Sequence, residues 1–154
     1  MRSLYQQFSK GMLATSYRIT NDLQESEDVL QEAFLSSFQK IDQLKESARY
    51  GDWLKRIVVN KSLVVVKKRI RFEEVETVFN QVEQEEELWY KGISFREIEK
   101  AIQQLPEGCR QVFSLFLLDN YKHQEISEML QISVSTSKSQ YRYALKLMRQ
   151  KLKR

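Results

Sequence analysis

One group of side chains suited to binding a polyanion lies in the segment 52–72, DWLKRIVVNKSLVVVKKRIRF. At about 100° per residue, a helix brings four polar residues of this segment into a narrow arc, and three further cations widen its basic side. The four are Arg56, Asn60, Lys67 and Arg71, and the three are Lys61, Lys68 and Arg69. Clustered cations with one amide, close to aromatic residues, favour nucleic acid as a ligand. A solvated cationic face is the alternative.

A second such group lies in the C-terminal stretch HQEISEMLQISVSTSKSQYRYALKLMRQKLKR. Two apolar-periodic segments separated by about four residues predict a helix-turn-helix, with Ser133 capping the second helix. Short hydroxyls and then cations are exposed along that helix: Ser135, Thr136, Lys138, Ser139, Arg142, Lys146 and Arg149. Hydroxyls at a helix start approach base edges in a major groove, while cations meet phosphates further along. The alternative is an amphipathic helix with an ordinary cationic face.

A third group is acidic and lies in the segment SEDVLQEAFLSSFQKI. Its expected buried stripe is Val29, Leu30, Ala33, Phe34, Leu35 and Phe38, and its outward side carries Glu27, Asp28, Gln31 and Glu32. Carboxylates near a helix start also favour the helix dipole. The acidic side of this helix therefore has two possible interpretations, a docking surface and a plain solvated face.

Little else in the sequence could perform chemistry. A single cysteine, Cys109, and a single histidine, His123, exclude an internal disulfide and most metal and catalytic-triad sites. We expect a buried filler at Cys109 and a partly exposed helix-start residue, not a ligand, at His123. No carboxylate pair or phosphate-cradling glycine loop is present, so we predict neither an enzyme nor a cofactor. The start of the chain lacks the apolar core of a signal peptide, which predicts a cytoplasmic protein.

The elements that must position these groups are predicted to be helices. The chain has 154 residues, of which 42% are apolar, and only four glycines and one proline interrupt it. This composition predicts an all-α fold. The net charge is +5 over 1–72, −7 over 73–109 and +6 over 110–154. We therefore predict two helical domains, 1–72 and 94–154, joined by an acidic linker, 73–93. A solvated helix joining two halves of one bundle is the alternative.

Helix boundaries follow from caps and apolar spacing. The first helix should end at Thr20-Asn21-Asp22, and a helix over 52–72 should bury Trp53, Leu54, Ile57, Val58 and Val65. In the second domain, Ser94 can cap a helix that closes before Pro106. The next helix should carry Val112, Phe113, Phe116 and Leu117 on one face and end at Asn120.

The pattern as a whole resembles the extracytoplasmic-function (ECF) sigma factors of the sigma-70 family. YRITNDLQESEDVLQEAFLSSF is similar to the family's core-binding helix, and DWLKRIVVNKSL is similar to its promoter-melting helix. QQLPEGCRQVFSLF with HQEISEMLQISVSTSKS is similar to its C-terminal four-helix domain. The resemblance covers nearly the full chain and rests on the order and spacing of these pieces.

The resemblance implies an initiation factor that binds core RNA polymerase and helps to open promoter DNA. It places Asp28, Gln31, Glu32 and Phe34 against the clamp helices of the beta-prime subunit, and it implies the beta flap as a further part of the polymerase partner. It places Arg56, Asn60 and Lys61, with the run 67–71, at the minus-ten element. It places Ser135, Thr136, Lys138, Ser139, Gln140, Arg142 and Lys146 at the minus-thirty-five element. An anti-sigma partner and a monomeric free state are also implied.

The chain departs from the family pattern at four positions. Gln140 stands where arginine is usual and Ser135 where glycine is usual. Gln131 replaces the turn glycine, and Lys122 replaces the serine cap of the helix that starts near His123. The changes at Gln140 and Ser135 leave the preferred promoter sequence open. Two rival functions also stay open: a helix-turn-helix regulator that never binds polymerase, and an all-helical adaptor with solvated basic faces.

Overall fold

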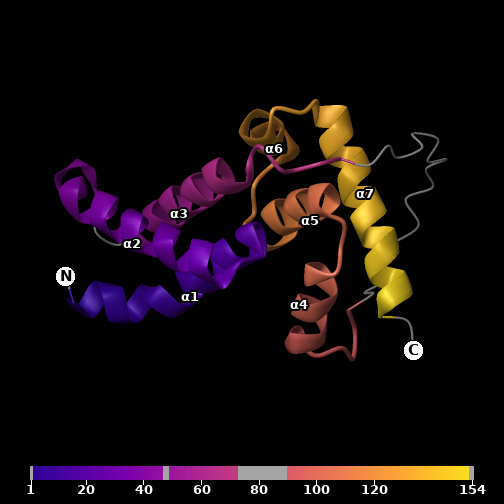
Figure 1. Cartoon of the computed structure of the whole chain (residues 1–154), viewed down its shortest axis with the longest axis horizontal. Helices are drawn as coiled ribbons and strands as arrows, with labels where there is room; N and C mark the ends of the chain where they lie inside the picture. Colours follow the sequence, from indigo (N-terminus) through magenta and orange to yellow (C-terminus); the bar gives the residue numbers. More distant parts are fainter. Residues whose placement is uncertain (1, 47–48, 73–89, 153–154) are drawn as a thin grey trace. The chain divides into compact units, whose positions relative to one another are not determined.

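The structure is a computed structural model that describes residues 2–46, 49–72 and 90–152. Within these ranges every regular element is helical, which confirms the all-α prediction. The chain divides into two compact units, Met1–Arg69 and Ile70–Arg154, and Figure 1 shows their helices. Most of the predicted acidic linker, residues 73–89, lies outside the described residues. The proposed domain limits therefore stay predictions.

The first unit contains three α-helices that pack against one another (Figure 1): α1 (Arg2–Thr20), α2 (Leu23–Gln39) and α3 (Tyr50–Val66). A short 3-10 helix, η1 (Ile41–Gln43), follows α2. The predicted boundary between α1 and α2 is confirmed. Asn21 takes a left-handed backbone (φ 54°), and the Asp22 carboxylate accepts a hydrogen bond of 2.9 Å from the Glu25 backbone N–H. Such a cap satisfies a backbone donor that the first turn of a helix leaves open.

The core of the first unit lies between α2 and α3, with apolar residues of α1 packed against it. It contains Val29, Leu30, Ala33, Phe34, Tyr50, Leu54 and Val58. Two hydroxyl pairs tie the helices together: Ser16 with Ser62 at 2.8 Å, and Ser37 with the Tyr50 hydroxyl at 2.7 Å. Both pairs are buried, so each satisfies polar atoms that would otherwise cost free energy in the core.

Two residues predicted for this core are exposed instead. Leu35 is 61% exposed and Val65 is 41% exposed, so both predictions were wrong. Leu35 follows the buried Phe34 by one position, which turns its side chain about 100° away from the packed stripe. The buried face of α3 continues through Val59, Leu63 and Val66, and this register turns Val65 outward.

The second unit begins with α4 (Phe95–Gln103), capped by Ser94 in a reciprocal arrangement with Glu97, and continues into α5 (Glu107–Phe113) after Pro106. Both boundaries were predicted. A π-helical turn, η3 (Ser114–Leu118), then extends α5. It buries Leu115 and leaves Leu117 37% exposed, so the predicted apolar face was wrong at Leu117. A π turn adds a residue to the helical repeat and shifts the face that later side chains occupy.

The helix-turn-helix is formed by α6 (His123–Leu130) and α7 (Val134–Lys151). The Ser133 hydroxyl accepts a hydrogen bond of 2.9 Å from the Thr136 backbone N–H, as predicted for the cap. Gln131 in the turn has φ 57°, the left-handed conformation that glycine adopts most readily. Asn120 before α6 has φ 61° and fits the same conformation better than most residues. No helix in the described ranges meets the length and hydropathy needed to cross a bilayer.

Candidate nucleic-acid interface

The outward face of α3 carries part of the predicted basic stripe. Arg56 and Asn60 are exposed and lie four residues apart, so they neighbour each other along the helix, and Lys61 beside them is half-buried. Trp53 packs against the core, as expected, with its ring 6.0 Å from that of Tyr50. An arginine and an amide on one exposed face can together contact phosphates and the hydrogen-bonding edges of bases.

The predicted stripe does not reach its last residue along the helix. α3 ends at Val66, Lys67 keeps a helical backbone as its C-cap, and Arg71 lies beyond the turn over 67–69, so the predicted four-residue arc was wrong at Arg71. The Arg69 backbone N–H bonds to the Val66 carbonyl at 2.9 Å, which closes the turn. The run of β-branched residues before the turn loses side-chain freedom in a helix, and this weakens its extension. Lys67 and Lys68 remain exposed on the turn.

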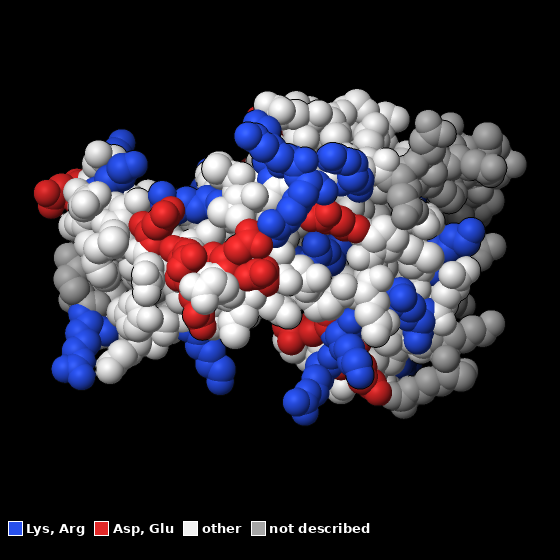
Figure 2. All heavy atoms as spheres, viewed as in Figure 1, with Lys and Arg blue, Asp and Glu red and all other residues white. Residues whose placement is uncertain are grey.

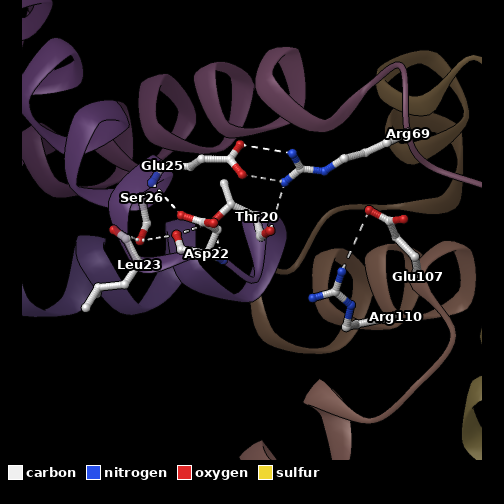
Figure 3. A network of polar contacts seen from close by, with 8 residues as sticks. All are labelled: Thr20, Asp22, Leu23, Glu25, Ser26, Arg69, Glu107 and Arg110. Atoms are coloured by element: carbon white, nitrogen blue, oxygen red, sulfur yellow. Dashed lines mark hydrogen bonds and ion pairs between the residues drawn. The ribbon is translucent and has the colours of Figure 1, made fainter.

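Arg69 is held by the body of its own unit (Figure 3). Its guanidinium forms an ion pair of 3.0 Å with Glu25 and donates a hydrogen bond of 3.0 Å to the Thr20 carbonyl. These contacts join the turn after α3 to the boundary between α1 and α2. In this structure Arg69 therefore fixes where the turn lies, and the neighbouring lysines carry the outward charge.

The acidic patch, defined as Glu27, Asp28, Gln31 and Glu32, lies exposed on α2. Figure 2 shows acidic side chains gathered over this helix. A groove between α1 and α2 adjoins the patch, lined by Tyr5, Ser9, Lys10, Leu13, Glu27, Leu30 and Gln31. The predicted contact residue Phe34 is only 3% exposed and packs in the core, so its side chain supports the helix from within.

The second helix of the helix-turn-helix, α7, presents most of the residues predicted to contact DNA. Ser135, Lys138 and Lys146 are exposed, whereas Thr136, Ser139 and Arg142 are half-buried. Gln140 is only 2% exposed, which places it in the packing of the unit and not on the outward face. The Ser133 hydroxyl donates a hydrogen bond of 2.8 Å to the Thr136 hydroxyl, so the cap fixes that side chain as well.

His123 joins this surface in a way that the sequence did not reveal. Its Nδ1 lies 2.7 Å from the Ser137 hydroxyl of α7, and its ring stacks on Phe116 at 4.4 Å between centroids. Burial lowers the pKa of His123, and the nearby Lys138 and Arg142 lower it further. A lone histidine fourteen positions from its serine partner carries no pattern in a sequence, so only the fold brings the two together.

The described residues hold no cluster of three or more His, Cys, Asp and Glu side chains that could bind a metal ion. Cys109 is 1% exposed, which confirms it as a core residue. Its thiol lies 3.4 Å from the Pro106 carbonyl at the start of α5.

Both units match known family models. Residues 4–71 match Sigma-70 region 2, and residues 95–148 match Sigma-70, region 4. The two matches follow each other in the order in which these regions are numbered. Together they cover most of the chain, including α3 in the first match and nearly all of α7 in the second.

The chain is similar to RNA polymerase sigma factors over most of its length. The ECF RNA polymerase sigma factor SigW of Bacillus subtilis is 27% identical over 150 residues, which cover 89% of this chain and 80% of that protein. The RNA polymerase sigma-H factor of Pseudomonas aeruginosa is 25% identical over 145 residues, covering 86% and 75%. The solved structure of the Bartonella quintana sigma factor RpoE in complex with the anti-sigma factor NepR has a similar fold. Its TM-score is 0.58 at 16% identity, over 99% of this chain and 98% of that one.

Proposed function

We propose that this chain, a member of the sigma-70 family and of its extracytoplasmic-function class, divides promoter recognition between its two units. The chain is a transcription initiation factor and not an enzyme. It binds core RNA polymerase and directs it to promoters. The observation that carries this function is the presence of sigma regions 2 and 4 in order on one chain, each with a basic helix on its surface.

The first unit is proposed to make the main contact with polymerase through α2. Asp28, Gln31 and Glu32 are exposed there, and they meet the beta-prime clamp helices in this proposal. Opposite charges on two surfaces steer their encounter and fix its register. Because the patch is rigidly carried by a helix packed into the core, docking costs little conformational freedom. The buried Phe34 contributes by holding α2 in place.

The same unit is proposed to hold the minus-ten element through α3 and the turn after it. Arg56, Asn60 and Lys61 supply base and phosphate contacts, with Lys67, Lys68 and Arg71 extending the positive surface. Taking a base out of the stack costs a few kcal/mol, about the value of two or three good contacts. A preformed cationic face offsets this cost by binding the open strand.

The second unit is proposed to read the minus-thirty-five element with α7. Ser135, Thr136 and Ser139 lie toward the start of the helix, where they can approach base edges in the major groove. Lys138, Arg142 and Lys146 follow at intervals of four and meet phosphates. In the holoenzyme this unit lies near the beta flap, and the complex associates with the nucleoid in the cytoplasm.

An anti-sigma protein is proposed as a second partner. The solved relative was captured with its anti-sigma factor, and its fold extends over the whole of this chain. A partner that covers the acidic patch would compete with polymerase for the same charges. We expect the free chain to be a monomer that exchanges between these two partners.

Co-elution with core polymerase followed by transcription from a randomised promoter library tests this function. We expect a stable complex and new transcripts that share two sequence elements. A folded chain that fails to bind cognate core polymerase would contradict the sigma function. Tight, unaided binding of a dimer to a palindromic duplex would instead support the helix-turn-helix regulator.

A further inference from the structure

The end of α3 carries a valine that folding does not explain. Val64 is 74% exposed, the largest fraction among the exposed large apolar side chains of the described residues. A β-branched residue in an exposed helix position lowers helix stability relative to alanine or lysine, and here no burial compensates for the loss. The neighbouring Val66 is fully buried, so the same residue type serves the core only two positions later.

The position of Val64 on the helix connects it with the proposed DNA contacts. Arg56, Asn60 and Val64 follow at intervals of four, and all three are exposed. Residues four apart on a helix are neighbours on its surface, so the three form one stripe. Asn60 therefore has an arginine on one side and an apolar side chain on the other.

Cations flank this apolar side chain. Lys61 lies three positions before Val64, while Lys67 and Lys68 lie three and four positions after it. Lys67 keeps a helical backbone (φ −49°, ψ −41°), so its Cα continues the surface of α3. An apolar side chain flanked by cations suits a ligand that combines an anionic backbone with an apolar group, and nucleic acid has this chemistry.

We propose that Val64 is a specificity-determining residue that contacts the C5 methyl group of a thymine in the minus-ten element, next to the base bound by Asn60. Thymine is the one DNA base with a methyl group, and apolar side chains read it by direct contact. The contact requires no donor or acceptor, which explains why an aliphatic residue continues a polar stripe. This inference rests on the proposed function of α3.

Replacement of thymine by deoxyuridine isolates this contact, because it removes the methyl group and keeps every hydrogen-bonding atom of the base. Each thymine of the minus-ten element of a library-selected promoter is replaced in turn, and promoter opening by the holoenzyme is measured. We expect one position at which the wild-type protein loses about fourfold in opening, the value of one buried methyl group. With Val64→Ala, the thymine and deoxyuridine promoters should open equally well at that position.

Val65→Ala provides a matched control, because Val65 has the same residue type on the same helix and is 41% exposed. It lies about 100° around the helix from Val64. We expect this variant to keep the full thymine-to-deoxyuridine ratio. Since the readout is a ratio within one protein preparation, a change in folding or in polymerase binding cancels.

Three results would overturn the proposal. The wild-type protein could show no position at which loss of the methyl group reduces opening, Val64→Ala could keep the full thymine-to-deoxyuridine ratio, or Val64→Ala and Val65→Ala could lose this ratio equally. A selected promoter without thymine in this element would also overturn it. Failure of the proposed function itself is separate, since the wild-type protein would then give no promoter-dependent opening on the unmodified template.

Discussion

The helices α3 and α7 both carry exposed cations, but they display them in different settings. α3 begins without a side-chain cap, beside the aromatic residues Tyr50 and Trp53. Its cations lie along its middle, and further cations lie on the following turn. α7 begins with a capped turn rich in hydroxyls, and cations follow at Lys138, Arg142 and Lys146. The first arrangement suits an irregular, opened strand, and the second suits a regular duplex groove. Net charge alone would not distinguish them.

The largest expected effect concerns the acidic patch of the first unit. The double substitution Asp28→Lys and Glu32→Lys should weaken co-elution with core polymerase at least about 100-fold, because like charges facing each other cost several kcal/mol. The control is Asp42→Lys with Glu46→Lys, the same charge change on exposed residues of the same unit outside the patch. Undiminished binding by the patch variant would remove polymerase docking from α2.

The charge spacing of α7 predicts a change in salt dependence. Lys138→Ala and Arg142→Ala should each reduce the slope of log affinity against log salt by about one for the minus-thirty-five duplex, since each releases one phosphate contact. The holoenzyme is titrated at several salt concentrations. Glu128→Ala, an exposed change on α6, serves as the control. An unchanged slope in both lysine and arginine variants would place the groove-binding surface elsewhere.

The turn before α7 holds Gln131 in a backbone conformation that costs free energy for any residue other than glycine. Gln131→Gly should stabilise the second unit by about 1 kcal/mol, because Gln131 holds φ 57° and glycine adopts this conformation without the steric penalty. Thermal unfolding of the full chain measures the gain. Asn120→Gly at φ 61° should give a smaller gain, since asparagine tolerates this region. A destabilised Gln131→Gly would show that the glutamine side chain makes a compensating contact.

The smallest expected effect is a dependence of stability on pH. The pKa of His123 in the folded chain lies below 6.5, so the unfolded chain binds the proton more readily. The neutral form of His123 therefore contributes its full stabilisation of the folded chain above pH 6.5, and this contribution is lost as the pH falls through the folded pKa. Denaturant unfolding at pH 7.5 and 5.5 should show this loss, and His123→Gln should reduce it, since the chain has a single histidine. An equal pH dependence in both proteins would contradict this linkage.

Much of this architecture was predictable because local signals decide it. Asp22, Ser94 and Ser133 cap helices as their residue types predict, and Pro106 separates two of them. The π turn after α5 was not predictable, since no local signal in residues 114–118 marks it. The β-branched run before the end of α3 weakens the helix, but it does not fix the residue at which the helix ends. The stripe of Arg56 and Asn60 was found from spacing, whereas the ion pair of Arg69 with Glu25 joins residues 44 positions apart. Pairing over that distance is set by tertiary structure.

The central claim is that α3 holds opened promoter DNA and α7 holds duplex DNA. The most direct test measures binding of holoenzyme to two fragments, a single-stranded minus-ten oligonucleotide and a minus-thirty-five duplex. We expect the double substitution Arg56→Ala and Asn60→Ala to lower the affinity for the single strand about tenfold or more and to leave the affinity for the duplex nearly unchanged. The double substitution Lys138→Ala and Arg142→Ala should lower the affinity for the duplex and leave the affinity for the single strand nearly unchanged. If both double variants lose affinity for the same fragment, the division of function between the two helices is contradicted.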